Sequence, residues 1–422
     1  MLLFAIVIFC LISHIPHPKL KIPKSNIPQL NHSNNSDNSD NSKKWWMYFT
    51  PSQAAQFYRS STFQKIKTET DKNHLNGLQT LPQECLKADS GVEKELRRGI
   101  ELLSVTYFTL KHGKYNGNHH QNLNIYLDNA KQLWLEVLNR APANKWTDSF
   151  DINLSDVKHS GNTCKENIGW YEGDITLRKW LSGTIPSYNM IRRDLSKDNR
   201  QKIDTWMGDI ANKMWNDRSF PFKHNRGVSR YSQAHLIALV LQDKKLFETY
   251  FHDKERGFYN KFSSFFNFLP NAACNKFINS NISSNIRTNI TGLTWEHTYK
   301  TGIYGRTAIA QFLNTANIIA FAAQNGGNPA WDYTINTEPS FLKATWKTWY
   351  SFGTKDRKRY ISWSNCLEQQ KFGKNQTNES HLNDEFWFPF ALRDRRFLGV
   401  KNWNNNDAIS ILRRYRAENT SL

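Results

Sequence analysis

Two clusters of polar and aromatic residues carry the side chains of this chain that are best suited to catalysis or anion binding. Each cluster leads directly into an apolar run typical of a helix that is buried on most sides, one starting at Ala234 and the other at Ala308. Such a helix is a rigid base, and its first turn can direct side chains and backbone N–H groups at an anion. The first cluster comprises His224, Asn225, Arg226, Arg230 and Tyr231, and the second comprises Trp295, His297, Tyr299, Tyr304 and Arg306.

These residue types suit the cleavage of a uronate polymer by β-elimination, a reaction that removes the weakly acidic proton beside a carboxylate. Asn and Arg side chains can neutralise the carboxylate through hydrogen bonds. A His or a deprotonated Tyr can act as the base, and a Tyr can donate a proton to the leaving glycosidic oxygen. The reaction needs no metal and no other cofactor, so the sequence predicts neither.

Aromatic side chains are numerous enough to suggest stacking on sugars as well as packing. The chain contains 15 Trp, 16 Tyr and 26 Phe, more than a core alone requires. We interpret Trp170, Tyr171 and Tyr188 as candidate substrate-binding rings. The further candidates for substrate binding are His224, Arg230, Trp295 and Arg306.

The sequence gives less support to two other interpretations, a glycosidase and a histidine that binds a ligand. A retaining or inverting glycosidase needs two facing carboxylates. Glu172, Asp174 and Glu296 are available, but nothing in their setting marks two of them as a pair. His235 lies inside the apolar run, where we expect a hydrogen-bonded core histidine rather than a ligand.

Helical periodicity dominates the middle of the chain, and no stretch of any length alternates as a strand does. The sequence therefore predicts an all-α or mostly α fold. Many consecutive amphipathic helices indicate a toroid of helical hairpins rather than a simple bundle. After Pro339 the pattern is less regular and fits short strands or long loops. The expected helices are Glu93–Leu110, Asn124–Leu138, Asp194–Trp215, Ser232–Phe247 and Thr307–Gln324.

The amino-terminal part divides into two segments that precede the predicted globular domain. Leu2–Ile12 is an apolar run of signal-peptide length, so we interpret residues 1–18 as an export signal or a short anchor. Asn31–Ser42 is polar and of low complexity, which makes residues 19–43 a disordered tether. Residues 44–422 then form a single domain of a secreted or periplasmic protein.

Four cysteines follow the tether, and no two of them have the spacing of metal ligands. An even number in an exported chain predicts two disulfides, with the pairing left open. Asn289 and Asn375 begin N-glycosylation motifs, which are used only in a eukaryotic secretory pathway. The cysteines are Cys85, Cys164, Cys274 and Cys366.

A formal net charge of +19 predicts a polyanionic partner: nucleic acid, an anionic membrane or an acidic polysaccharide. The signal-like start and the absence of a recognisable nucleic-acid-binding module favour the polysaccharide. We expect no nucleic acid, and no stable membrane partner unless the amino-terminal segment stays uncleaved. The oligomeric state is not determined by these features.

The first cluster and the helix after it resemble the alginate (poly-mannuronate) lyase superfamily. That family carries Asn-Asn-His or a close variant before a helix that closes on Asp-x-x-Leu-Phe. Here Asn225-Arg226 precedes a helix that ends in Asp243-Lys-Lys-Leu-Phe247. His297-Thr-Tyr299 is similar to the family's His-Asn-Tyr.

The resemblance extends over roughly residues 95–395 through further short motifs. The segment from Ile185 to Asp194 and the helix to Trp215 are similar to the family's preceding inner helix. Asn325-Gly, followed by Trp331 and Tyr333, is similar to the end of its next helix and the Trp-x-Tyr beyond.

This resemblance implies an incomplete (α/α) toroid, export, and β-elimination on an acidic polysaccharide. Asn225 would neutralise the carboxylate, with Arg226 in the place that the family usually gives to His. His297 would then serve as the base, and either Tyr299 or Tyr304 would be the catalytic tyrosine. The loss of the usual His also leaves open a non-catalytic protein that binds acidic polysaccharide with the same toroid.

Overall fold

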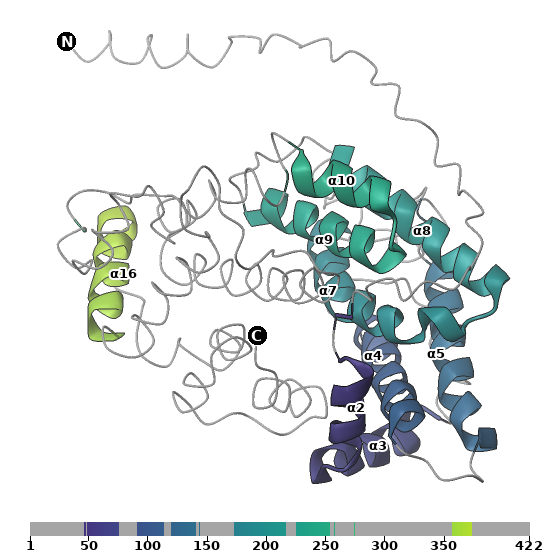
Figure 1. Ribbon diagram of the computed structural model, residues 1–422. Coiled ribbons are helices and arrows are strands. Elements are labelled where there is room, and N and C mark those ends of the chain that lie inside the picture. Colours follow the sequence, from purple (N-terminus) through teal and green to yellow (C-terminus); the bar gives the residue numbers. More distant parts are fainter. Residues whose placement is uncertain are drawn as a thin grey trace, which may run out of the picture. The chain divides into compact units, whose positions relative to one another are not determined.

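The computed structural model describes a helical body built from most of residues 46–253 and a separate helix near residue 365 (Figure 1). The chain divides into two compact units, Met1–Asn41 and Ser42–Leu422, and every described residue belongs to the second. Within the described residues the regular structure is helical and contains no strand, which confirms the mostly α prediction. The described residues are 46–47, 49–75, 91–113, 120–140, 143, 173–216, 225–253, 257, 274 and 357–373.

Nine α-helices and one short 3₁₀ helix make up the described part. Three of the five expected helices agree with observed ones apart from a few terminal residues, and Thr307–Gln324 lies outside the described residues. The helices are α2 (Pro51–Tyr58), α3 (Ser61–Asn73), α4 (Gly91–His112), α5 (His120–Arg140), α7 (Gly173–Ile191), η4 (Arg192–Asp194), α8 (Lys197–Asn216), α9 (Asn225–Leu241), α10 (Lys244–His252) and α16 (Arg357–Phe372).

The expected helix Ser232–Phe247 is wrong, because the structure ends α9 at Leu241 and begins a new helix at Lys244. Gln242 adopts a left-handed backbone conformation with φ 57°, which stops the helix. The Asp243 side chain then accepts a hydrogen bond from the Leu246 N–H at 3.0 Å and caps α10. A second correction concerns α16, which is a helix in the region expected to hold short strands or loops.

Three helices, α4, α7 and α9, form the buried row of the fold. Every residue of 99–110, 183–191 and 230–240 is buried. The helix α7 packs against α4 on one side and against α9 on the other, as Figure 1 shows. Burial on all sides explains the unbroken apolar run from Leu236 to Val240 in α9, whereas ordinary surface helices carry a polar face.

The helices α5, α8 and α10 cover the buried row and keep one side exposed. The helix α5 packs against α4, whereas α8 and α10 pack against α9. In α8 the apolar positions Ile203, Met207 and Ile210 recur at helical spacing and are fully buried, while the polar residues Gln201, Lys202, Thr205 and Asp209 are exposed. This alternation explains why the helical periodicity of α5 and α8 is readable in the sequence.

The helices α4 and α7 run parallel. Midway along them Glu101 lies so close to Gly183 that a Cβ on residue 183 would overlap its carboxylate. At their carboxyl ends Lys111 forms an ion pair with Asp194, directly after α7. Because each contact joins residues at similar distances from the start of their helices, α4 and α7 point the same way.

The helix α9 also runs parallel to α7, because the chain reverses twice between them. Tyr188 and Arg192, near the end of α7, both contact Asp204 in the first half of α8. Trp215, at the end of α8, lies 5.5 Å from the Tyr231 ring near the start of α9. Two successive hairpins therefore bring the amino-terminal ends of α7 and α9 to the same end of the buried row.

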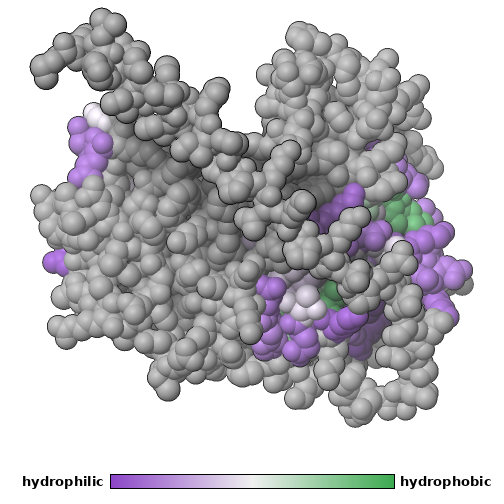
Figure 2. Space-filling model, turned by 90° about the horizontal axis from the view of Figure 1, so that it is seen from above, coloured by the Kyte–Doolittle hydropathy of each residue, from purple (hydrophilic) through white to green (hydrophobic). Residues whose placement is uncertain are grey.

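The sulfurs of Cys274 and Cys366 form a disulfide between a segment after α10 and helix α16. This pair accounts for two of the four cysteines expected in disulfides, and Cys85 and Cys164 lie outside the described residues. Among the described helices, none is both long enough and apolar enough to cross a membrane. The described surface in Figure 2 is mostly hydrophilic with small apolar areas.

Candidate functional site

The first polar cluster lies inside a helix rather than ahead of one. The helix α9 begins at Asn225, so Asn225 and Arg226 occupy its first turn, while His224 lies outside the described residues. The backbone N–H groups of a first helical turn have no partners within the helix and carry a partial positive charge. The structure thus places an amide and a guanidinium residue at an end that already favours anions.

Arg230 and Tyr231 follow one turn later, and both are buried. Arg230 is 1% exposed, which is unusual for an arginine and requires polar partners around its guanidinium. The Tyr231 ring packs edge-on against Trp215. Tyr231 is therefore part of the contact between α9 and α8.

His235 belongs to the core, as its position in the apolar run predicts. The side chain is fully buried, and its Nε2 lies 2.7 Å from the backbone oxygen of Tyr250 in α10. Its ring also packs against Trp215 and Phe251. The expectation of a hydrogen-bonded core histidine is confirmed.

Tyr188 has a structural environment that differs from the sugar-stacking position suggested by the sequence. The side chain is fully buried, and its ring packs edge-on against Trp134 at 5.3 Å. Its hydroxyl donates to Asp204 Oδ1 at 2.7 Å. Burial and the Asp204 charge hold the pKa of Tyr188 well above its usual value, although Arg192 acts in the opposite direction. The covered ring favours a role in the α7–α8 hairpin over contact with a sugar.

The other predicted site residues lie outside the described part of the chain. Trp170 and Tyr171 directly precede α7 in the sequence, and α7 starts at Gly173. The helices α7 and α9 start at the same end of the buried row. The second cluster, also outside the described residues, comprises Trp295, His297, Tyr299, Tyr304 and Arg306.

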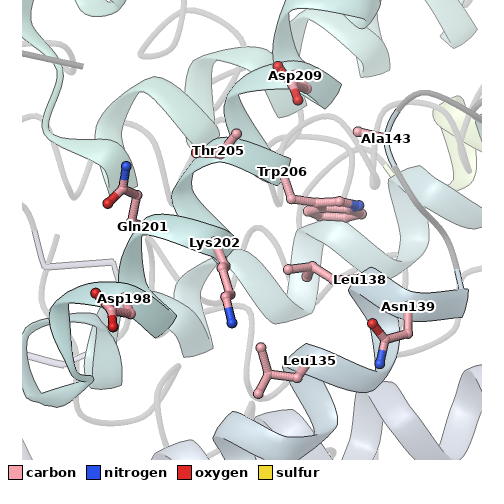
Figure 3. A pocket seen from close by; sticks show the side chains of 10 residues that line it. All are labelled: Leu135, Leu138, Asn139, Ala143, Asp198, Gln201, Lys202, Thr205, Trp206 and Asp209. Carbon is pink, nitrogen blue, oxygen red and sulfur yellow. The ribbon is translucent and has the colours of Figure 1, made fainter. Parts of the chain in front are cut away.

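A groove of about 1000 Å³ separates α5 from α8 (Figure 3). Its apolar part consists of Leu135, Leu138, Ala143 and Trp206, and Figure 3 shows the Trp206 ring lying beside Leu138 between the two helices. The groove exists because the α8 positions that face it carry polar side chains instead of a packing face. The polar lining residues are Asn139, Asp198, Gln201, Lys202, Thr205 and Asp209.

The charges of this groove do not suit a polyanion. Asp198 and Asp209 oppose the single cation Lys202 among the residues that line it. Nearby, the Lys213 ammonium donates to the Ala143 carbonyl. Burial lowers the pKa of Lys213, an effect that Asp209 partly offsets. The groove was not predicted from the sequence, although the polar residues at helical spacing in α8 indicate it.

Within the helices and short segments that the structure describes, no group of three or more His, Cys, Asp or Glu residues could hold a metal ion. Comparison of the chain with protein-family models and with curated protein sequences finds no match.

Proposed function

We propose that this chain is a polysaccharide lyase that cleaves a uronate-containing polymer, such as alginate, by β-elimination. The observation that carries the proposal is the start of α9 at Asn225, with Arg226 in the same turn. An Asn amide and an Arg guanidinium can both donate to a carboxylate, and the partial positive charge of the helix end adds to the attraction. Together they would lower the cost of placing a second negative charge beside the carboxylate in the transition state.

The architecture that we infer around this site is an incomplete (α/α) toroid. Its support is the parallel buried row of α4, α7 and α9, each followed in the chain by a helix outside the row. Such an arrangement gathers the amino-terminal ends of the inner helices at one end, where a long polymer can be bound across them. The resemblance to alginate lyases compares the segment from Ile185 to Trp215 with one inner helix. In the structure only the first part of this segment, the end of α7, lies in the buried row, whereas α8 covers the row from outside.

The proposed reaction needs a base and a proton donor, and residues of this chain can supply both. Asn225 and Arg226 hold the uronate carboxylate while His297 removes the proton from the adjacent carbon. The electron pair forms a carbon–carbon double bond as the glycosidic carbon–oxygen bond breaks, and Tyr299 or Tyr304 donates a proton to the departing oxygen. A new unsaturated sugar end and a new hydroxyl end result. The net charge of +19 and the signal-like start fit an exported protein that acts on an acidic polymer.

The test is the ultraviolet absorbance of the conjugated, unsaturated uronate during incubation of the purified protein with separate polymers. The panel contains poly-mannuronate, poly-guluronate, glucuronan, hyaluronan, chondroitin and heparan chains. A rise in absorbance with one polymer supports elimination and identifies the substrate. Binding of a polymer without any rise would replace this proposal with the non-catalytic binding protein, whereas hydrolysis would give new chain ends without the chromophore. Displacement of the polymer by duplex DNA, with a steep salt dependence, would support a nucleic-acid-binding protein instead.

A further inference from the structure

The helix α9 has two opposite faces, and α8 and α10 pack against one of them. Tyr231 and His235 belong to the face that packs against Trp215 of α8 and against Tyr250 and Phe251 of α10. Positions 226, 230 and 233 follow the i, i+4, i+7 spacing of a single helix face. At 3.6 residues per turn this second face lies on the side of α9 away from α8 and α10.

Gln233 on this second face is a buried polar residue whose acceptor is unused. The residue is 1% exposed. Within the part of the chain that the structure describes, its Oε1 has no hydrogen-bond partner. A buried carbonyl oxygen without a donor costs free energy, about 1 to 3 kcal/mol, so most such atoms in folded proteins are paired. The Gln233 oxygen is therefore an acceptor that the described part of the chain leaves available to a donor.

The direction of helical side chains brings Gln233 closer to the start of α9. Position 233 lies about 10 Å along the axis from position 226, from the ordinary helical rise. Long helical side chains lean toward the amino terminus and cover the preceding turn. The Gln233 side chain is therefore expected to extend toward the level of Arg230, and so toward the end of α9 that begins with Asn225.

We propose that Gln233 is a substrate-binding residue, whose carboxamide oxygen accepts a hydrogen bond from a sugar hydroxyl of the bound polymer. This inference rests on the proposed lyase function. A carboxamide oxygen repels the negative uronate carboxylate and requires a donor, which the sugar hydroxyls supply. On this proposal the carboxylate is bound at positions 225 and 226 at the start of α9, and a sugar hydroxyl is bound by Gln233 farther along the helix.

The experiment compares Gln233→Met with a matched control, Thr109→Val. Methionine has nearly the shape of glutamine and adapts to its surroundings, but it has no strong acceptor. The control removes the Thr109 hydroxyl on α4, which is also buried and also without a partner among the described residues. Thr109 lies near the carboxyl end of its helix, away from the proposed site. Polymer affinity, KM, kcat and the urea midpoint of unfolding are measured for all three proteins.

The expected result is an affinity for the polymer that falls about tenfold in Gln233→Met, as the loss of one hydrogen bond to a neutral group implies. Its unfolding midpoint should be unchanged or higher, because an unsatisfied polar atom has been removed. Thr109→Val should bind like the wild type. Equal binding by Gln233→Met and the wild type would overturn the inference, and so would an equal loss in both variants. A Gln233→Met protein that fails to fold would overturn it too, because its premise is an acceptor that the described part of the chain does not use.

Failure of the proposed function gives a different result. In that case the wild-type protein itself neither binds nor cleaves any polymer of the panel. If the wild type binds and cleaves while Gln233→Met matches it, the lyase stands and only the role of Gln233 is lost.

Discussion

Arg192 and Asp204 form a two-point salt bridge across the turn between α7 and α8. Arg192 Nε donates to Asp204 Oδ1 at 3.0 Å, and its Nη2 donates to Oδ2 at 2.7 Å. The Tyr188 hydroxyl donates to the same Oδ1. The Arg192 and Asp204 side chains are only 16% and 14% exposed, so the pair is protected from screening by solvent. The contact fixes the point at which the chain leaves the buried row and enters α8.

Replacement of Asp204 by Ala should destabilise the protein, because it leaves Arg192 charged, mostly buried and without this partner. We expect the free energy of unfolding to fall by about 2 to 3 kcal/mol, somewhat below the usual value for fully buried pairs. Urea denaturation measures this change. The control is Asp128→Ala, which breaks an ion pair with Lys131 at a residue whose side chain is 60% exposed. That control should cost less than about 0.5 kcal/mol, and an equal loss in both variants would contradict the structural role of Asp204.

The sequence predicted α4, α5 and α8 from apolar positions that recur at helical spacing, and this signal did not identify α7. The spacing of Ile203, Met207 and Ile210 is sufficient to identify α8. Periodicity did not identify α7, because Gly183 and Pro186 are poor helix residues. The close approach of Glu101 explains the glycine, since a larger residue would overlap it. The packing of α7 between two helices thus outweighs its low intrinsic propensity.

The candidate site was predictable only where the polar residues stand directly at the start of a buried helix. Asn225 and Arg226 were found in this way, although the helix starts seven residues earlier than expected. Tyr188 was interpreted as a sugar platform because composition does not show which aromatic rings are covered. Its burial depends on Asp204, which a chain reversal brings to it. Gln233 directly precedes the apolar run that starts at Ala234, and nothing in the sequence distinguished it from an ordinary polar residue at a helix entrance.

Substitution of Gly183 by Ala should destabilise the contact between α4 and α7. The new Cβ would overlap the carboxylate of Glu101, which is 2% exposed and has little room to move. The expected loss is about 2 kcal/mol or more, despite the better helix propensity of alanine. Thermal or urea unfolding detects it. Combining Gly183→Ala with Glu101→Ala should cost less than the sum of the two single changes, because the second change makes room for the new methyl group. Strict additivity would show that the two residues do not meet.

His74 should make the stability of the protein sensitive to mild acid. Its side chain is 7% exposed, its Nε2 has no partner among the described residues, and its ring lies against Gly99. Burial lowers the pKa of His74 below its ordinary value, an effect that Glu95 and Glu69 oppose and Arg98 reinforces. The folded state therefore binds the proton less readily than the unfolded state. The contribution of His74 to stability is present above the ordinary pKa of about 6.5 and is lost as the pH falls below it.

The measurement for His74 is the free energy of unfolding between neutral and mildly acidic pH, in the wild type and in His74→Gln. The wild type should lose more stability with falling pH than the variant, by at most about 1.4 kcal/mol per pH unit for one proton. His252→Gln serves as the control for the substitution itself, at a histidine whose side chain is 45% exposed. Identical slopes in the wild type and His74→Gln would show that His74 titrates alike in the folded and unfolded states.

Asn225 is the residue on which the proposed chemistry depends most directly. Its replacement by Ala removes a donor to the uronate carboxylate at the moment when a second negative charge develops beside it. We expect the rate of formation of unsaturated ends to fall about 100-fold to 1000-fold, as for the removal of a single donor to a developing anion. Binding of the polymer should weaken much less, because the greatest benefit of this donor arises in the transition state. Asn139→Ala provides the control, since Asn139 lines the groove between α5 and α8 and contributes no positive charge. A full elimination rate in Asn225→Ala, with the control also active, would move the carboxylate site away from the start of α9.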